Sequence, residues 1–260
     1  MSAAIHILAS GSKANAYIIE ADNSMLLIDQ GLSFKEFSRR AEILGIDISR
    51  IKGILLTHEH DDHIRGVAYT AYKLDAPVFS TAQTLEILNA NAKRPIHCRV
   101  VEKDRKVKLG AFEFTPFEIL HDAADPVGYL VSAPCGETVC FATDTGKVTN
   151  RMMTYINQGT RIILEANHDP AMLYRNVHYP PVLKERIRGQ FGHLSNEQSL
   201  EALERMGENH PKTVIFSHLS EENNSPQMLK DLIINFRQAH CLDFKAFIAN
   251  QNNPLSIPLL

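Results

Sequence analysis

The stretch Thr57-His58-Glu59-His60-Asp61-Asp62-His63 governs how the rest of this 260-residue chain is interpreted. It follows an apolar run, Ile51 to Leu56, and precedes an amphipathic run, Ile64 to Leu74. It therefore places three imidazoles and three carboxylates where a buried strand is expected to end. Burying so many titratable groups costs free energy unless they are paired or bind a cation. The stretch predicts a metal site.

The composition limits the classes of protein to which the chain can belong. The chain is 44% hydrophobic and 22% charged, and its net charge of −3 provides no general basic field for nucleic acid, although a local basic groove remains compatible with it. The four cysteines are scattered, so no disulfide framework is predicted. No apolar run approaches the roughly 18 residues that span a bilayer, and the first fifteen residues do not resemble a signal peptide. We expect a cytoplasmic protein with reduced thiols.

Strand and helix signals alternate along the chain without a repeat or a linker. Strands are expected at Ile5–Ala9, Tyr17–Glu20, Met25–Ile28, Ile51–Thr57, Pro77–Ser80, Lys106–Leu109, Phe112–Phe117, Val127–Ala133, Val139–Ala142, Arg161–Ala166, Thr213–Ser217 and Lys245–Ala249. Helices are expected from Ser33 towards Gly45, after the histidine cluster, up to Asn91, from Ser195 to about Met206, and at Pro226–Ala239, whereas residues 168–193 look less regular. This order predicts one α/β (α+β) domain over residues 1–260, with two sheets packed face to face and helices outside.

The histidine stretch itself has room for two metal ions. Side chains alternate along an extended chain, so His58 and His60 should point the same way. Asp62 and His63 should fall in the turn and in the first helical turn, aimed back at the same space. Two rival zinc motifs do not match the sequence. A zincin would need histidine at position 62, which is Asp62, and a zinc deaminase would need C-x-x-C, whereas the cysteine that follows Cys135 is Cys140.

Further ligands are expected at strand ends. His121, Asp144 and His218 each follow an apolar, strand-like run directly or within a residue or two. A single histidine in such a place is more often structural. Three such residues in a chain that already contains the cluster favour metal ligation.

Taken together, these motifs resemble the metallo-β-lactamase superfamily. The resemblance runs in order from Asp29 through the histidine stretch, His121, the segment 142–146 and Ser217-His218, over nearly the whole chain. It implies the four-layer αββα sandwich of that family. It also implies a ligand set in which metal 1 is held by His58, His60 and His121, metal 2 by Asp62, His63 and His218, and Asp144 bridges both. Such nitrogen and oxygen donors suit two divalent ions, zinc or manganese, without choosing between them.

A two-metal site of this kind implies a hydrolase, because two ions can convert water into hydroxide and stabilise the developing charge. The substrate is indicated elsewhere, by His193 in Gly192-His193-Leu194-Ser195-Asn196. A histidine there resembles the one that ribonuclease Z and related nucleases place near their second metal. We expect His193 to act with Asp62 and Asp144 in catalysis, by binding the scissile phosphate or protonating the leaving oxygen. Alternatively, His193 supports the start of the following helix.

Local matches narrow the resemblance to the WalJ/YycJ-type branch of bacterial DNA exonucleases. They are Ser10-Gly11-Ser12-x-Ala14-Asn15, Glu165-Ala166-Asn167-His168-Asp169, Tyr179-Pro180, Leu183-Lys184-x-Arg186-Ile187 and His218-Leu219-Ser220-x-x-Asn223-Asn224. The usual glycine before Asn15 is Ala14 here. The resemblance implies a two-metal phosphodiesterase that degrades DNA from 5′ to 3′ with metal-bound hydroxide.

Four side chains are candidates for substrate contacts or for support of the ligands: Asn15, His168, Arg186 and Asn223. Lys184, Arg186 and Arg188 alternate, so they either contact phosphates together or form a solvated helical face. Three other functions stay open at this point. A ribonuclease Z-like enzyme should carry a long arm for RNA, a thioester, lactone or β-lactam hydrolase would not need His193, and a regulatory metal protein would be expected to lack some ligands.

Overall fold

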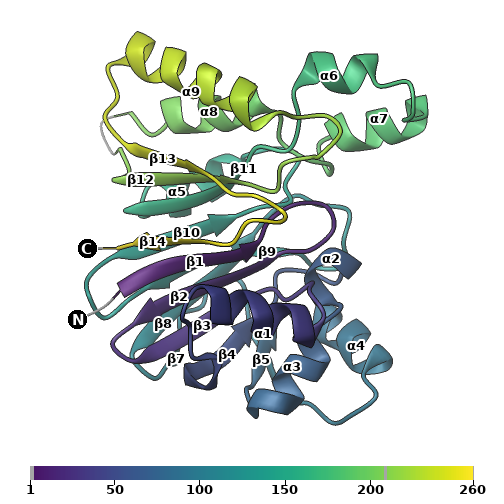
Figure 1. The fold of residues 1–260 in the computed structure, drawn as a ribbon, viewed down its shortest axis with the longest axis vertical. Helices are drawn as coiled ribbons and strands as arrows, with labels where there is room; N and C mark the ends of the chain where they lie inside the picture. The colour runs from purple at the N-terminus through teal and green to yellow at the C-terminus, as the bar shows by residue number, and fades with distance from the viewer. Residues whose placement is uncertain (1–2, 208–209, 260) are drawn as a thin grey trace.

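The computed structural model describes residues 3–207 and 210–259, and within them two seven-stranded sheets pack against each other (Figure 1). The first sheet has the order β14-β1-β2-β3-β4-β5-β6 and the second the order β13-β12-β11-β10-β9-β8-β7. The first contains β1 (Ala3–Ala9), β2 (Ala16–Ala21), β3 (Ser24–Ile28), β4 (Ile51–Leu55), β5 (Val78–Ser80), β6 (Cys98–Val100) and β14 (Leu255–Pro258). The second contains β7 (Val107–Leu109), β8 (Phe112–Glu118), β9 (Val127–Ser132), β10 (Thr138–Ala142), β11 (Arg161–Glu165), β12 (Thr213–Ser217) and β13 (Lys245–Ile248).

Helices cover the outer face of each sheet. Against the first sheet lie α1 (Phe34–Ile43), α2 (Asp61–Ile64), α3 (Val67–Leu74) and α4 (Ala82–Asn91), with the short 3-10 turn η1 (Ile48–Arg50) before β4. Against the second lie α5 (Asn150–Ile156), α8 (Asn196–Glu204) and α9 (Pro226–His240). Two further helices, α6 (Pro170–Arg175) and α7 (Pro181–Arg188), project beyond the sheets at the upper right of Figure 1.

The buried side chains form three clusters that correspond to the three interfaces between layers. Tyr17 of β2 and Phe141 of β10 meet edge to face between the sheets, with ring centroids 4.9 Å apart. Ile18, the next residue in β2, instead packs outward among the side chains of α1, α3 and α4. Both faces of each sheet are therefore apolar, which explains why these strands appear in the sequence as continuous apolar runs. The predicted αββα sandwich is confirmed.

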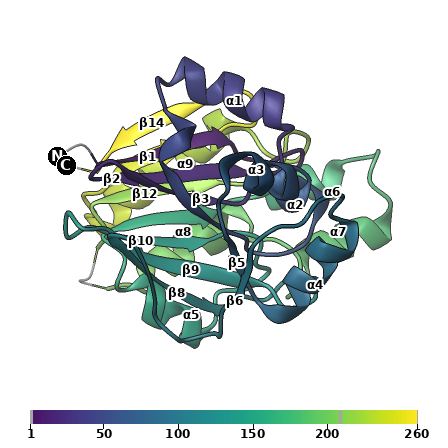
Figure 2. The ribbon, with the colours of Figure 1, turned by 90° about the horizontal axis from the view of Figure 1, so that it is seen from below.

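One edge of the sandwich collects the chain segments that follow the parallel strands. β3, β4, β5 and β6 run parallel in the first sheet, and β10, β11, β12 and β13 run parallel in the second. Carboxyl ends of parallel strands lie at the same edge of a sheet, where crevices for ligands commonly form. Figure 2 shows α2, α6 and α7 together on one side, with the start of β1 and the paired end of β14 on the opposite one.

The structure corrects the sequence interpretation in several places. Residues 168–193 contain two helices, α6 and α7, whose short length and flanking prolines hid their periodicity. The amphipathic run from Ile64 to Leu74 is not one helix, because the chain breaks at Gly66, where a β-carbon would lie 2.1 Å from the Leu32 carbonyl oxygen. β6, β14 and α5 were not predicted. Among the described residues, none of the helices has the length and apolar character needed to cross a bilayer.

Candidate metal centre

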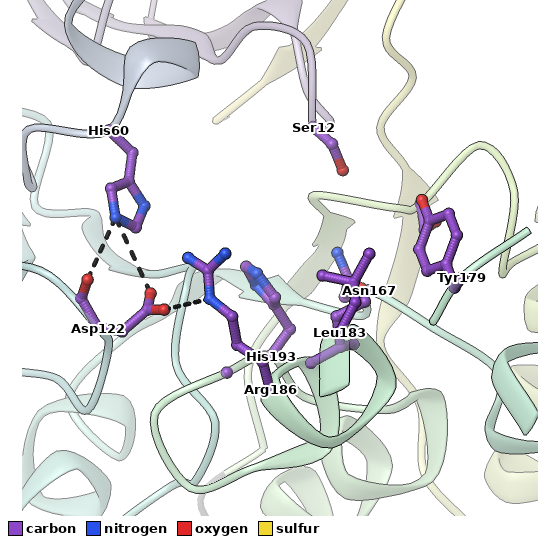
Figure 3. A pocket seen from close by; sticks show the side chains of 11 residues that line it. Ser12, His60, Asp122, Asn167, Tyr179, Leu183, Arg186 and His193 are labelled. Atoms are coloured by element: carbon purple, nitrogen blue, oxygen red, sulfur yellow. Dashed lines mark hydrogen bonds and ion pairs between the residues drawn. The ribbon is translucent and has the colours of Figure 1, made fainter. Parts of the chain in front are cut away.

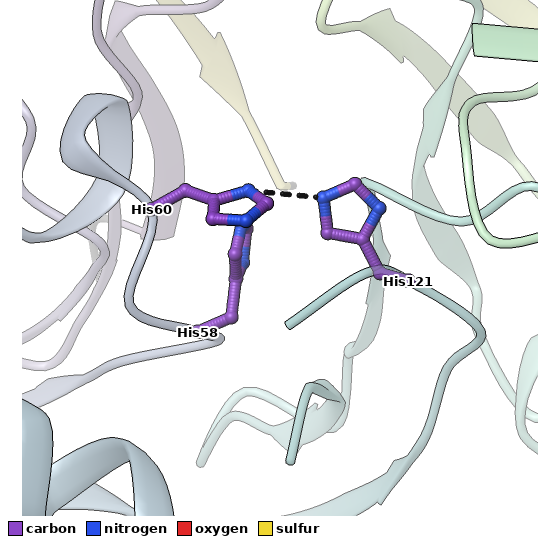
Figure 4. Close-up of side chains that lie close together, drawn as sticks. All are labelled: His58, His60 and His121. Atoms are coloured by element: carbon purple, nitrogen blue, oxygen red, sulfur yellow. Dashed lines mark hydrogen bonds between the residues drawn. The ribbon is translucent and has the colours of Figure 1, made fainter. Parts of the chain in front are cut away.

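Three of the predicted ligands, His58, His60 and His121, converge at the edge where β4 and β8 end (Figure 4). Their candidate ligand atoms lie within 4.8 Å of one another. His121 Nε2 is 3.2 Å from His60 Nδ1, and the His58 and His60 rings meet edge to face at 4.7 Å. The loop after β4 supplies two of these imidazoles from the first sheet, and the loop after β8 supplies the third from the second.

A second group joins Asp62 and His63 of α2 to His218, which directly follows β12. The Nε2 atoms of His63 and His218 each lie 3.3 Å from Asp62 Oδ2. Both predicted sets of three are thus groups of neighbouring donors. Two further groups, His58, His63 and Asp144, and Asp144, Glu165, His193 and His218, overlap with them.

Asp144 lies between the two clusters. Its Oδ2 is 3.4 Å from His63 Nε2, and its Oδ1 is 3.4 Å from His218 Nε2 and 4.0 Å from His121 Nε2. The backbone is left-handed at both Asp144 and His218, with φ of 55° at each. Left-handed residues other than glycine are uncommon and gather at functional sites. Here the turn directs each side chain from its strand end into the shared space.

The donors fit divalent cations. Within the described part of the chain, two buried atoms in this group, His58 Nε2 and Asp144 Oδ2, have no hydrogen-bond partner. A buried polar atom without a partner costs about 1–3 kcal/mol and needs an explanation. A bound ion would supply that partner. Imidazole and carboxylate donors in this arrangement suit divalent metal ions.

A buried carboxylate orients two imidazoles from behind. Asp29 directly follows β3, and its Oδ2 lies 2.7 Å from His63 Nδ1. Its other oxygen accepts a hydrogen bond from the Thr57 backbone, while the Thr57 hydroxyl lies 2.9 Å from His58 Nδ1. These contacts at Nδ1 leave the Nε2 atoms of His58 and His63 for a metal, as is usual for metal-binding histidines.

Glu165, the last residue of β11, plays a similar part on the other side. Its Oε1 lies 2.7 Å from His193 Nδ1 and 2.9 Å from His218 Nδ1. Its Oε2 accepts from the backbone amides of Thr145 and Leu194 at 3.0 and 3.1 Å. Burial alone would raise the pKa of Glu165, but His193 and His218 lower it to about 2. Glu165 therefore stays ionised and connects His193 to His218, one of the predicted ligands.

Burial and neighbouring carboxylates shift the pKa values of the imidazoles in opposite directions. Burial lowers the pKa of His58 and His121, so these two rings are neutral and ready to coordinate. Burial also opposes the charge on His218, but Asp144, Asp62 and Glu165 raise its pKa to about 10. The pKa of Asp144 is held well below its ordinary value against burial by His218 and His63. Metal binding at the second cluster must therefore release protons.

A cavity of about 180 Å³ opens beside the donor clusters, and His60 is the predicted ligand that lines it (Figure 3). Ser12, Asn167 and Tyr179 line one part of it, and Arg186 lines another. Arg186 forms an ion pair with Asp122, the residue after His121. His193 also lines the cavity, and because its Nδ1 is bonded to Glu165, its Nε2 is the ring nitrogen left for a ligand.

The four predicted substrate contacts do not lie together. Arg186 lines the cavity. Asn15 is fully buried and its side chain is bonded to Asp62 and His63, so it is placed to support predicted ligands. Asn223 is also buried, and its side-chain oxygen accepts a hydrogen bond from Asn176. His168 lies in a different cavity, on the far side of α7.

Sequence reasoning gave Glu165, Thr57 and Asp122 no role at this site. Glu165 and Thr57 occupy the same kind of position as the predicted ligands, at or just after the end of an apolar strand. Applying the strand-end criterion to every polar residue would have found them. The position of Asp122 depends on α7, which the sequence did not indicate.

Comparison with known proteins agrees with this geometry. The family model described as "Beta-lactamase superfamily domain" matches residues 25–219. The chain is 34% identical over 228 residues to exodeoxyribonuclease YycJ of Bacillus anthracis, covering 86% of this chain and 85% of that protein. It is 32% identical over 250 residues to exodeoxyribonuclease WalJ of Streptococcus pneumoniae, covering 93% and 92%.

Among solved structures, the metallo-β-lactamase fold protein YhfI from Bacillus subtilis matches 96% of this chain and 99% of its own with a TM-score of 0.69 at 13% identity, which supports the fold alone. The family match, the relatives and the donor clusters lead to one conclusion. The chain belongs to the metallo-β-lactamase superfamily of hydrolytic enzymes, and within it is similar to the YycJ and WalJ proteins over most of its length.

Proposed function

We propose that this protein is a metal-dependent exonuclease that hydrolyses phosphodiester bonds in DNA from the 5′ end. The observation that carries the proposal is the position of His193, whose Nδ1 lies 3.8 Å from Asp144 Oδ1 and 2.7 Å from Glu165 Oε1. A proton donor beside the metal clusters suits a reaction whose leaving group is an alkoxide. The names of the relatives support DNA as the substrate, and the direction rests on the resemblance to the WalJ/YycJ-type branch.

Different residues of this chain would have different roles in the reaction. His58, His60 and His121 would hold one divalent ion, Asp62, His63 and His218 would hold the other, and Asp144 would be shared. Such a pair of ions supplies activation of water and neutralisation of charge on the phosphoryl oxygens. Arg186 adds a cation at the wall of the cavity, where it can attract the phosphate backbone.

His193 acts on the leaving oxygen in this proposal. Glu165 accepts a hydrogen bond from Nδ1, so Nε2 is the nitrogen towards the cavity. The ring gives a proton from Nε2 as the doubly protonated imidazolium and is left neutral, with its remaining proton on Nδ1. The cavity volume of about 180 Å³ is smaller than the 300–1,000 Å³ usual for small-molecule sites. It has room for about one phosphate and its sugar over the reacting position.

The test offers purified protein, loaded with zinc or manganese, 5′-labelled duplex DNA, single-stranded DNA, RNA and a chromogenic β-lactam. We expect DNA to be cleaved with early release of labelled mononucleotide. Chelation should abolish this activity, and Asp144→Asn should abolish it together with a loss of bound metal. Asp61→Asn is the matched control, because Asp61 is exposed and lies outside the donor clusters found in the described residues.

Exclusive turnover of the lactam, or of RNA, would overturn the proposal. Full activity in a pure Asp144→Asn preparation would overturn the shared role of Asp144. Release of the label only after the rest of the strand had been degraded would contradict the 5′-to-3′ direction while leaving the phosphodiesterase activity in place.

A further inference from the structure

Helix α7 separates two cavities, and its residues divide between them according to helical spacing. Leu183, Arg186 and Ile187 line the metal cavity. The residues that line a second cavity are Pro181, Lys184, Glu185 and Arg188. Each set follows the i, i+3, i+4 pattern of one helix face. The three cations that alternate in the sequence therefore serve different spaces, with Arg186 on one side and Lys184 and Arg188 on the other.

The second cavity, called here the α6–α7 cavity, has a volume of about 320 Å³ and an apolar wall. Leu173 and Tyr174 of α6 form this wall together with Pro181. Tyr174 is 80% exposed, and within residues 3–207 and 210–259 no side chain of α7 is buried. An aromatic ring left open beside apolar side chains is a surface on which a nucleobase can stack.

A buried histidine also lines this cavity and lacks a partner. His168 is 2% exposed, and its Nδ1 has no hydrogen-bond partner in the part of the chain that the structure describes. Burial lowers the pKa of His168 to about 4, so the ring is neutral and has one nitrogen that donates and one that accepts. Buried polar groups are normally satisfied, and the exceptions commonly mark a missing ligand or water.

The charges of the α6–α7 cavity favour an anion. Lys184 and Arg188 contribute two cations against the single carboxylate of Glu185. Arg188 pairs with Glu185, and Lys184 Nζ donates to the Tyr174 carbonyl oxygen at 2.7 Å. All three side chains are on the exposed helix α7, so both cations are placed to contact a phosphate of a bound strand.

The two cavities adjoin. Asn167 lines the metal cavity, and His168, the next residue, lines the α6–α7 cavity. Tyr179 and Pro181 divide in the same way around the start of α7. The His168 carbonyl oxygen also accepts from the Asn196 backbone at 2.9 Å, so His168 is joined to the segment that carries His193.

We propose that the α6–α7 cavity binds one nucleotide of the substrate strand, adjacent to the nucleotide held over the metal clusters. Its base stacks on Tyr174 and Leu173 and bonds to the His168 imidazole, while its phosphate meets Lys184 and Arg188. The inference rests on the proposed function, because it assumes that the strand is a nucleic acid. It adds a subsite on the far side of α7 that would hold the strand beside the reacting end.

The experiment measures binding of a hydrolysis-resistant phosphorothioate DNA oligonucleotide to the zinc-loaded enzyme by fluorescence anisotropy. Tyr174→Ala and the double variant Lys184→Ala/Arg188→Ala should each weaken binding by about tenfold. The matched control is Arg105→Ala/Lys106→Ala, which also removes one arginine and one lysine. Arg105 forms the same i, i+3 pair with a glutamate as Arg188 does, and both control residues lie outside the two cavities. The control should bind within twofold of the unmodified protein.

A second readout locates the nucleotide. The Cε1–H signal of His168, assigned by its loss in His168→Gln, should shift when the oligonucleotide binds, and Tyr174→Ala should need about ten times more oligonucleotide to reach half of the full shift. Equal weakening by both double variants, or a His168 signal that stays in place at saturation, would overturn the subsite. Hydrolysis of ordinary DNA by the unmodified enzyme is scored separately. Cleavage without a His168 shift therefore defeats the subsite alone, and a shift without cleavage defeats the proposed function alone.

Discussion

At the scale of single residues, Glu165 is central to the site although the sequence did not single it out. Its two oxygens meet two imidazoles and two backbone amides. It therefore determines the tautomers of His193 and His218 together. Because both rings present Nε2 to the site only while Nδ1 donates to Glu165, this carboxylate is a positioning residue for both.

Glu165→Gln tests this role. The glutamine amide has one oxygen and one NH₂ group, so it cannot accept from all four neighbours, and one set of donors must face the NH₂ group. We expect kcat to fall by about 10- to 100-fold, with a changed pH profile and reduced metal content. Nuclease kinetics across pH and metal analysis of the same samples measure this. Glu102→Gln, on an exposed side chain, is the control; an unchanged pH profile in Glu165→Gln would contradict the role.

At the scale of elements, α1 holds the loop that supports the site. Arg40 is 7% exposed, and its Nη1 donates to the carbonyl oxygens of Leu8 at 2.8 Å and Gln251 at 2.6 Å. The Gln251 side chain in turn bonds to the backbone of Lys13 and Ala14. Asn15, which follows directly, contacts the ligands Asp62 and His63. A helix on the outer layer is thereby connected to the metal site.

Arg40→Ala should lower the free energy of unfolding by about 2 kcal/mol, because it leaves two buried carbonyl groups without a donor. Arg39→Ala is a matched control on the same helix. Arg39 and Arg40 both pair with Glu36, but the Arg39 side chain is 54% exposed, so its loss should cost less than about 0.5 kcal/mol. Urea unfolding of both variants measures the difference. Equal losses would show that the carbonyl contacts of Arg40 add nothing.

At the scale of the whole molecule, each donor cluster joins the two halves of the sandwich. His58 and His60 follow β4 of the first sheet, whereas His121 follows β8 of the second. The other cluster likewise combines α2, which follows β4, with His218 after β12. Ions bound at both clusters would therefore join the sheets at this edge.

Removal of metal should accordingly destabilise the fold. Each ion that binds only the folded state, at a concentration about a thousand times its Kd, adds roughly 4 kcal/mol. Loss of even one such ion on chelation corresponds to a fall in Tm of about 10 °C. Thermal unfolding with and without chelator measures this, with metal content determined in parallel. The fall should be smaller in Asp144→Asn, which has less metal to lose. An unchanged Tm after complete removal of metal would contradict the stabilising role.

Prediction from sequence worked where a residue's neighbours along the chain decide its place. The apolar runs and their breaks located β1 to β5 and β7 to β13, and the strand ends indicated His121, Asp144 and His218. It failed at α6 and α7, which are short and, in the described part of the chain, keep all but Leu173 away from the core. Without an apolar stripe to bury, such helices leave little periodic signal.

The sequence by itself determined the αββα class and the set of side chains that converge on the metal clusters, because strand periodicity and polar strand ends are local properties of the chain. Only the tertiary structure decided which atoms meet. Glu165 reaches both His193 and His218 because β11 lies beside β12 and packs near the loop before α8. The separation of Arg186 from Lys184 and Arg188 likewise depends on the position of α7. A helix points neighbouring residues in different directions, and the local sequence does not determine which cavity lies in each direction.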